Sequence, residues 1–526
     1  MISEATLLHE FVLTSAERNP AAQALHDGHA VTSYAELADE LRWFASGLAS
    51  LGISRGERIG IFLDKQREAV VASFGAPAHG AVFVPINPLL KPDQVGHILR
   101  DCNVRVLVTS PQRLAALIDT VRLCPDLAHV VVTGNVPAAA TRVPEVHAWK
   151  DLLDAPARAG WRVVDNDIVS ILYTSGSTGR PKGVVLSHRN MVAGAKSVAS
   201  YLRNHSEDVL LAALPLSFDA GFSQLTTGFH VGAQVVLLNY LLPKDVIKAV
   251  LRHRITGLTA VPPLWIQLTQ ATWANGAGAS LRYFANTGGR MPLETLNRLR
   301  AALPQAKPFL MYGLTEAFRA TYLPPDEVER RPDSIGKAIP NSEILVLRSD
   351  GTSCDVDEPG ELVQRGALVA QGYWNDPEKT AERFKPLPGR EGALVLPEMA
   401  VFSGDTVRYD SEGFLYFIGR RDEMIKSSGY RISPTEVEEV IYSSVLVAEC
   451  VAFGVPHDAL GESVVVVLTA AAGVVFEVED LYAYCRSRMP AYMVPSAIHV
   501  REDPLPRNAN GKIDRKAISA EYTAGV

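Results

Sequence analysis

Short, continuous runs of β-branched and other apolar residues alternate with segments of helical spacing between residues 34 and 132. Runs that are apolar on both faces are typical of parallel strands covered by helices on either side. The same alternation returns between residues 209 and 312. The strands are expected at 57–63, 81–84, 104–108 and 129–132, and then at 209–211, 235–238, 257–261 and 308–312. The sequence therefore predicts an α/β protein whose body contains two doubly wound sheets.

The remainder of the chain has a different pattern. A polar, proline-bearing stretch at 324–332 is followed by short strands and turns up to Ile418, which predicts a small β-barrel-like unit. Beyond it, helices at 434–443 and 478–488 alternate with strands at 446–453 and 464–468, as in a compact α+β domain. We expect an N-terminal domain over 1–419 and a mobile C-terminal domain over 420–526.

Composition limits the binding partners and the cellular compartment that we expect for this protein. The 526 residues carry a net charge of −7, so no overall basic surface attracts nucleic acid or anionic lipid. The five cysteines lie far apart and match no zinc spacing, which favours reduced thiols. The N-terminus lacks the pattern of a signal peptide, and the longest apolar run, 463–476, is too short to span a bilayer. We expect a cytoplasmic protein without a membrane span.

The densest chemical signal is the segment 173–183, YTSGSTGRPKG, which follows an apolar strand and precedes another. Its glycines allow backbone N–H groups to approach an oxyanion, and its hydroxyls and Lys182 add further donors, so it suits a polyphosphate. A plain flexible turn is the alternative. The Walker pattern fails at Pro181 and the dinucleotide pattern fails at Thr178, which excludes both of those nucleotide folds.

A competing motif is the segment 52–56, GISRG, which satisfies the hydrolase elbow with Ser54 as nucleophile. The elbow requires a strand before the serine and a helix after it. The local pattern predicts the reverse order, so a serine hydrolase remains only an alternative.

At residues 173–183 the sequence resembles the AMP-forming adenylate ligases, the superfamily of acyl-CoA synthetases, peptide-synthetase adenylation domains and luciferase. Further segments resemble motifs of this superfamily in the same order along the chain: 311–316 (MYGLTE), 403–405 (SGD), 419–422 (GRRD), 425–431 (IKSSGYR) and 510–512 (NGK). The stretch 313–325 looks most like stand-alone acyl-CoA ligases associated with exosortase gene clusters.

The resemblance implies a ligase that forms an acyl-AMP and pyrophosphate from a carboxylic acid and Mg-ATP, and then passes the acyl group to a thiol. Thr174, Ser175, Ser177, Thr178 and Lys182 would hold the β- and γ-phosphates, Thr315 the α-phosphate, and Glu316 the Mg²⁺ ion. Tyr312 would stack on adenine, while Asp405 and Arg420 would bind the ribose. The implied ATP and AMP site comprises Thr174, Ser175, Gly176, Ser177, Thr178, Gly179, Lys182, Gly288, Tyr312, Gly313, Thr315, Asp405, Arg420 and Arg431.

The same resemblance assigns catalysis to Lys512, Thr315, Glu316 and Lys182. Lys512 would bridge the substrate carboxylate and the α-phosphate, and the C-terminal domain would then rotate about a hinge at Asp422. Gly429 would line the phosphopantetheine tunnel in the second step.

The expected acyl pocket comprises Phe218, Asp219, Phe222, Ala285, Thr287, Met311, Arg319 and Ala320. Amino-acid-activating relatives have F-D-x-S here, with the aspartate accepting the substrate ammonium, whereas this chain has Gly221 in place of the serine. Asp219 either fills that role or caps the following helix. Arg319 either pairs with Asp219, binds a second substrate carboxylate, or faces solvent.

Besides the serine hydrolase, the other alternative for the activity is a non-catalytic or luciferase-like oxidative relative. It is disfavoured because every charged motif residue is present. The acceptor is either CoA or the phosphopantetheine of a carrier protein. Because no carrier domain follows Val526, a carrier is expected to act in trans, including for a stand-alone amino-acid adenylation enzyme.

Overall fold

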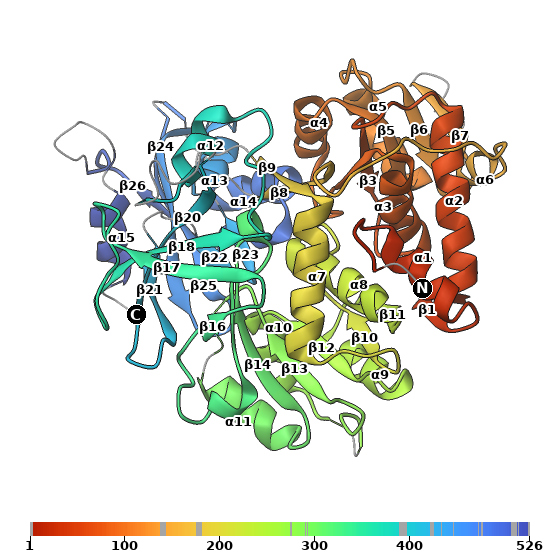
Figure 1. Ribbon diagram of the computed structural model, residues 1–526. Coiled ribbons are helices and arrows are strands. Elements are labelled where there is room, and N and C mark those ends of the chain that lie inside the picture. Colours follow the sequence, from red (N-terminus) through yellow and green to blue (C-terminus); the bar gives the residue numbers. More distant parts are fainter. Residues whose placement is uncertain are drawn as a thin grey trace.

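The computed structural model describes residues 4–136, 144–174, 181–273, 276–289, 291, 293–388, 397–420, 425–432, 434–444, 446–471, 473–474, 477–506, 513 and 515–523. Their strands form four sheets (Figure 1). The predicted loop residues 175–180, hinge residue Asp422 and Lys512 lie outside this description.

The first sheet has seven described strands in the order β7-β6-β5-β3-β4-β8-β9. The strands are parallel except β9, which returns antiparallel to β8. Their bounds are β3 (Arg58–Phe62), β4 (Val82–Pro85), β5 (Val104–Thr109), β6 (His129–Val132), β7 (Glu145–Ala148), β8 (Ile168–Thr174) and β9 (Lys182–Ser187).

The second sheet has nine described strands in the order β16-β15-β14-β13-β12-β10-β11-β1-β2, with a parallel centre and antiparallel edges. Their bounds are β1 (Gln23–His26), β2 (Val31–Ser33), β10 (Val209–Ala212), β11 (Gln234–Leu237), β12 (Gly257–Ala260), β13 (Tyr283–Asn286), β14 (Lys307–Tyr312), β15 (Thr321–Leu323) and β16 (Lys337–Ala338). The two doubly wound layers are confirmed. The sequence pattern does not indicate β1, which lies beside β11 although more than two hundred residues separate their partnered positions.

Helices cover both faces of each sheet, so the body has five layers. One shared core lies between the sheets and includes residues from α1 (Glu10–Arg18), α2 (Tyr34–Ser50), α3 (Arg67–His79), α7 (His188–Leu202) and α8 (Asp219–Val231). The outer face of the first sheet packs on α4 (Pro92–Asp101) and α5 (Pro111–Val121). The outer face of the second packs on α9 (Pro243–Arg252), α10 (Pro262–Gln270) and α11 (Leu293–Ala302). A short α6 (Trp149–Leu153) packs against α2.

The predicted β-rich unit is a five-stranded antiparallel sheet. Its strands and its helix are β17 (Ser342–Leu347), β18 (Gly360–Gly366), β19 (Phe384–Pro386), β20 (Met399–Tyr409), β21 (Leu415–Arg420) and α12 (Pro377–Arg383). Two short 3-10 helices, η2 (Thr315–Ala317) and η3 (Pro325–Glu327), precede it.

The C-terminal α+β unit contains a second five-stranded sheet, whose elements lie on the side of the molecule away from the N-terminus in Figure 1. Its elements are β22 (Ile425–Ser427), β23 (Tyr430–Ile432), α13 (Pro434–Tyr442), β24 (Val447–His457), β25 (Gly461–Ala470), α14 (Val478–Arg488), η4 (Ala491–Met493), β26 (Ala497–Arg501) and α15 (Arg515–Thr523).

Three expectations about the class of protein can be compared with the structure. Ser54 lies in the turn between helix α2 and strand β3, so a helix precedes the serine and a strand follows it. This is the reverse of the order that a hydrolase elbow requires. All five cysteines are buried and free of disulfides. Among the described residues, we find no helix with the length and apolar character needed to cross a membrane.

The N-terminal segment is held to α7 by a contact that requires a neutral histidine. The backbone N–H of Leu8 donates to Nδ1 of buried His188 at 2.9 Å. Burial, reinforced by nearby His9, lowers the pKa of His188 from 6.5 to about 3.

Because the folded state takes up this proton less readily than the unfolded chain does, acidification from about pH 6.5 toward 3 lowers the free energy of unfolding. The contribution of His188 is at most about 1.4 kcal/mol per pH unit. Thermal unfolding between pH 7 and 4 should show a shallower loss of Tm with falling pH in His188→Gln than in the unmodified chain. Equal pH slopes would contradict this role.

Candidate active site

The expected phosphate loop leaves the first sheet at its antiparallel edge. Thr174 ends β8, Lys182 begins β9, and the two residues are directly paired across the strands. Of the loop between them, Ser175, Gly176, Ser177, Thr178 and Gly179 lie outside the described residues. Lys182 therefore lies where the largely buried pair of strands β8 and β9 meets the loop.

Lys182 belongs to a cluster with Tyr373 and Glu316. The Lys182 Nζ atom lies 5.3 Å from the centroid of the Tyr373 ring, and the Tyr373 hydroxyl donates to Glu316 Oε1 at 2.7 Å. Burial lowers the pKa of Lys182, and Lys379 lowers it further, while Asp376 opposes the shift. Tyr373 therefore contacts a cation through its ring and a carboxylate through its hydroxyl group.

Tyr373 was not predicted from the sequence. It is placed by an antiparallel bridge to Val184 of β9 and by a hydrogen bond of 2.7 Å from the Trp374 N–H to the Gly183 carbonyl. The segment that carries it is distant in sequence from both partners. No local pattern reveals such a contact.

A second cluster joins β14 to the β-rich unit. The Tyr312 hydroxyl donates to Asp405 Oδ2 at 2.5 Å, and Asp405 is almost fully buried. Asp405 is paired in the sheet with Arg420, of which only the backbone is described. The backbone N–H of Asp405 donates to Ser403 Oγ at 3.0 Å. Residues expected to contact adenine and ribose thus contact each other.

The segment after β14 carries the remaining nucleotide candidates. Gly313 follows Tyr312, and Thr315 and Glu316 form the first turn of η2. Glu316 is half-buried and its carbonyl accepts from the Ala370 N–H at 2.8 Å. Its carboxylate oxygens are of the type that Mg²⁺ prefers, so the donor chemistry fits the metal expected there.

Asp219 and Arg319 form a buried ion pair. Arg319 Nη1 lies 3.0 Å from Asp219 Oδ2, and the arginine side chain is only 3% exposed. Asp219 is the first residue of α8, whose N-cap is Phe218, and it also accepts the Ala220 N–H. Arg319 therefore does not face solvent. The N-cap interpretation of Asp219 is wrong by one position, although its carboxylate still meets the first helical turn.

Arg319 is held by a strained turn. Phe318 has a φ of +57° and a ψ of −43°, and the Arg319 N–H donates across it to the Ala317 carbonyl at 2.5 Å. This γ-turn is rare for a residue with a side chain. The buried Phe318 ring fills the space where Gly194 of α7 lacks a side chain. The packing on α7 thus keeps the arginine in place.

A cavity of about 20 Å³ lies beside Arg319, with room for about one water molecule. Of the predicted acyl-pocket residues, Met311 and Arg319 line it. Phe222 instead packs on Phe74 and Phe83 in the core between the sheets, with ring centroids 5.6 and 4.8 Å away. Ala285 and Thr287 are buried at the end of β13, and Ala320 is buried just before β15; none of the three lines the cavity.

The turn of the C-terminal hairpin contacts this region. Ser428 and Gly429 both have positive φ, as a two-residue hairpin between β22 and β23 requires. The Gly429 backbone lies against Val261 and approaches Gly288, and the Tyr430 ring lies 5.1 Å from that of Phe218. Arg431 is described only by its backbone. The predicted tunnel residue thus lies next to the tyrosine that contacts Phe218 of the predicted acyl pocket.

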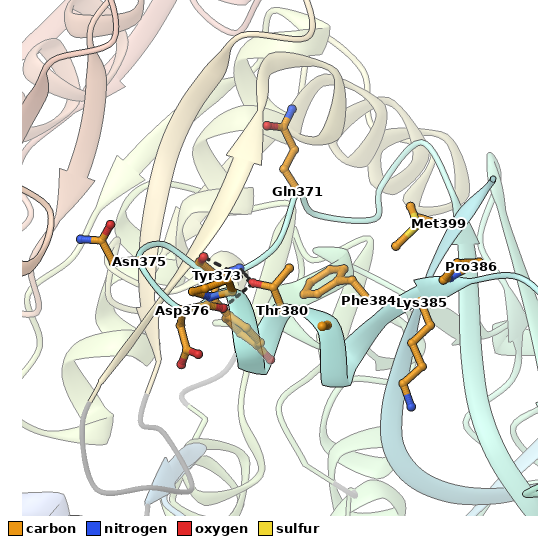
Figure 2. A pocket seen from close by; sticks show the side chains of 11 residues that line it. Gln371, Tyr373, Asn375, Asp376, Thr380, Phe384, Lys385, Pro386 and Met399 are labelled. Carbon is orange, nitrogen blue, oxygen red and sulfur yellow. Dashed lines mark hydrogen bonds between the residues drawn. The ribbon is translucent and has the colours of Figure 1, made fainter. Parts of the chain in front are cut away.

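A larger hollow of about 640 Å³ lies beyond Tyr373, between α12 and the strands β19 and β20 (Figure 2). The Thr380 hydroxyl accepts from the Tyr373 N–H at 2.9 Å at its inner wall. None of the predicted site residues lines it. Tyr373 therefore separates this hollow from the Lys182 and Glu316 cluster.

Two family profiles match the chain. The profile of AMP-binding enzymes matches residues 12–374, and that of the AMP-binding enzyme C-terminal domain matches residues 436–512. Together they extend over most of both predicted domains.

Similar curated proteins differ in their named acceptor. A long-chain-fatty-acid–CoA ligase of Bacillus subtilis (strain 168) is 27% identical over 98% of this chain and 94% of its own length. An L-proline–[L-prolyl-carrier protein] ligase of Pseudomonas fluorescens is 29% identical over 98% of this chain and 99% of its own. A linear gramicidin synthase of Brevibacillus parabrevis is 29% identical over 98% of this chain, but this chain spans only 6% of its length.

Solved structures share the fold. The o-succinylbenzoate CoA synthetase MenE of Bacillus subtilis superimposes with a TM-score of 0.81 at 26% identity, over 96% of this chain and 97% of that one. VinN in complex with L-aspartate has a TM-score of 0.67 at 31% identity, over 78% of this chain and 98% of that one.

The packing of α8 explains why Gly221 replaces the serine of the F-D-x-S pattern. A Cβ atom at 221 would overlap the carbonyl of Pro215. Gly221→Ser should therefore lower Tm by several degrees, since the overlap is with backbone and costs about 2 kcal/mol or more. Ala220→Ser, at the half-buried neighbouring position, is the matched control in the same thermal unfolding assay. A Gly221→Ser protein as stable as the control would show that the 214–218 segment moves freely.

Proposed function

This chain belongs to the family of AMP-binding enzymes and is an AMP-forming ligase, and we propose that it makes an acyl thioester in two steps. A carboxylate oxygen of the substrate attacks the α-phosphorus of ATP, forming an acyl-AMP and expelling pyrophosphate. The sulfur of CoA or of a carrier's phosphopantetheine then attacks the acyl carbon, forming a thioester and expelling AMP.

The observation that carries this proposal is the Lys182, Tyr373 and Glu316 cluster at the end of the β8 and β9 pair. Negative charge accumulates on phosphate oxygens in the first step, so a fixed cation is needed beside the polyphosphate. Lys182 would supply it, and Glu316 would hold the Mg²⁺ that ATP brings. The bond from Tyr373 orients the Glu316 carboxylate for that task.

The nucleoside would be held nearby. The hydrogen bond between Tyr312 and Asp405 fixes the tyrosine ring, on which adenine would stack, next to the carboxylate that would bind the ribose with Arg420. Thr315 would contact the α-phosphate, and Thr174 would join the loop hydroxyls on the β- and γ-phosphates. Arg431 would contact phosphate in the adenylating arrangement.

The contact of Gly429 with Val261 and Gly288 supports a role for the C-terminal hairpin in the second step. Gly429, which has no side chain, would leave a narrow path beside the acyl pocket for the pantetheine arm. We infer that the described arrangement is the thiol-accepting one, and that rotation near Asp422 between the units 1–419 and 420–526 would bring Lys512 to the acyl-AMP site.

A second candidate concerns the acid. The half-buried Asp219 carboxylate and the 31% identity to VinN, whose solved complex contains L-aspartate, favour an amino acid over a fatty acid. The acceptor stays open between CoA and a carrier protein, since relatives of both kinds have similar identity.

The reaction is tested by pyrophosphate release from ATP over amino, fatty, aryl and dicarboxylic acids, followed by mass spectrometry with CoA and with carrier proteins. Lys512→Ala should slow acyl-AMP formation roughly 10²-fold or more, because a transition-state donor is lost, while transfer from preformed acyl-AMP persists. Lys516→Ala is the nearby control. Wild-type rates of pyrophosphate release in Lys512→Ala would refute the assignment.

The hinge is tested separately. Asp422→Pro should spare adenylation and abolish thioester formation, because proline fixes the backbone φ at the expected pivot. Asp422→Ala keeps the backbone free and should retain both steps. Quenched-flow measurement of acyl-AMP and thioester separates the two rates, and equal loss of both in Asp422→Pro would argue against a hinge.

A further inference from the structure

Three side chains that can bind a metal meet at the edge of the first sheet, outside the candidate active site. His129 begins β6, and Glu145 and His147 belong to β7, the outermost described strand beside β6 (Figure 1). His129 is directly paired with Glu145. Glu145 and His147 are two residues apart on one strand, so all three side chains lie on the same face of the sheet. The pairing of the strands thus brings two imidazoles and a carboxylate together.

The distances between the ligand atoms are close to those that one metal ion requires. His129 Nδ1 lies 3.1 Å from His147 Nε2 and 3.4 Å from Glu145 Oε2. The same carboxylate oxygen lies 3.9 Å from His147 Nε2. Ligand atoms of a tetrahedral zinc ion are about 3.3 Å apart, given zinc–ligand distances of about 2.0–2.2 Å. The Glu145 side chain is 69% exposed, so a small rotation of it completes the geometry.

Both imidazole rings are largely enclosed by the protein. The side chain of His129 is 15% exposed and that of His147 is 20% exposed. The His129 ring also forms a hydrogen bond with the backbone of Leu51, the C-cap residue of α2. Hydrogen bonds from the ring to backbone carbonyls commonly orient histidines that bind a metal. The two rings are therefore positioned before any ligand arrives.

One cation lies near the cluster and would oppose a metal ion. Arg105 is close enough to His129 to affect its pKa. The Arg105 Nε atom lies 3.2 Å from Glu57 Oε1, and its Nη1 atom donates to the Asp126 carbonyl at 2.8 Å. Glu57 thus balances the charge of Arg105. The carboxylate of Glu145 is left to offset the charge of a metal.

The types of ligand atom determine which metal fits. Two imidazole nitrogens and one carboxylate oxygen suit Zn²⁺ and neighbouring transition metals, whereas Mg²⁺ and Ca²⁺ prefer oxygen ligands. Three protein ligands leave the fourth tetrahedral position to a water molecule. The cluster therefore favours zinc over the magnesium that accompanies ATP.

The cluster is also separate from the groups expected to act on phosphate. His129 and Glu145 are the first residues of their strands, whereas Thr174 is the last residue of β8. β6, β7 and β8 run in the same direction within the first sheet. The cluster and the phosphate loop thus lie at opposite ends of the parallel strands, and a metal here takes no part in adenylation.

We propose that His129, Glu145 and His147 bind a zinc ion that joins the edge strand β7 to β6. Zinc takes the place of the hydrogen between His129 Nδ1 and His147 Nε2, and each neutral ring keeps its proton on the other nitrogen. β7 leads directly into α6, where the Trp149 ring packs on Phe44 of α2 at a centroid distance of 5.2 Å. The bound metal therefore stabilises the attachment of both β7 and α6 to the body.

Calorimetric titration of the metal-free chain with ZnCl₂, in excess Mg²⁺, tests this proposal. His129→Gln and His147→Gln should each weaken zinc binding at least about 10-fold, since even the loss of a residue that only orients a metal ligand has such an effect. Glu145→Gln should also weaken it, and its exposed position makes misfolding no explanation. His253→Gln is the matched control, because it removes one ring of another histidine pair, with His26 at a centroid distance of 4.5 Å.

Two further measurements separate a built site from general attraction of cations. Co²⁺ in place of Zn²⁺ should give the intense visible absorption of tetrahedral coordination, and Glu145→Gln should reduce it. Zinc should raise the Tm of the unmodified chain and of His253→Gln by more than it raises that of His147→Gln.

The proposal is overturned if the chain does not bind zinc, or if His129→Gln and His147→Gln bind it as tightly as the unmodified chain. Zinc binding that is lost in His253→Gln instead would place the metal elsewhere and overturn it as well. Pyrophosphate release should be the same in Glu145→Gln as in the unmodified chain, so the outcome for zinc is independent of the ligase function.

Discussion

A parallel strand covered on both faces leaves only its ends free to meet a ligand. In this protein the shared core between the two sheets and the helices on the outer faces cover the faces of both sheets. Thr174, Tyr312 and the segment before Asp219 all lie at such ends. The β-rich unit and the C-terminal hairpin then close over this edge, since Asp405 and Gly429 contact residues that emerge from it. The position of the chemistry follows from how the sheets are buried.

Much of the body is predictable because its signals are local. A run such as that of β5 is apolar on both faces, and this property alone identifies a central parallel strand. β1 and β13 lack such a signal, because each has only four residues; β1 takes its place from pairing with β11, which is distant in the chain. α14 begins and ends where the helical pattern predicts. Continuous apolar runs therefore locate strands, whereas the place of a short strand such as β1 depends on tertiary contacts.

The candidate site shows the same distinction between local and tertiary information. The sequence identifies Lys182, Glu316, Asp405 and Arg319 as candidate site residues, but it does not identify the residues that they contact. A β-bridge to Val184 of β9 positions Tyr373, whose hydroxyl donates to Glu316, and no local sequence pattern predicts this bridge. The sequence leaves open whether Arg319 pairs with Asp219 or binds a ligand, and the distance of 3.0 Å between Arg319 Nη1 and Asp219 Oδ2 shows that they pair. From the sequence, Gly221 is only a departure from the F-D-x-S motif. The structure shows that the Pro215 carbonyl leaves no space for a side chain at this position.

The contact between Gly194 and Phe318 has a consequence for divergence among relatives. Gly194 belongs to α7, yet the space it leaves determines where the strained Phe318 turn lies and hence where the guanidinium of Arg319 rests. A substitution there would move a charge in the pocket without altering any residue that lines it. Substrate specificity can therefore change through substitutions at positions that do not line the pocket. Two proteins with identical pocket-lining residues need not accept the same acid.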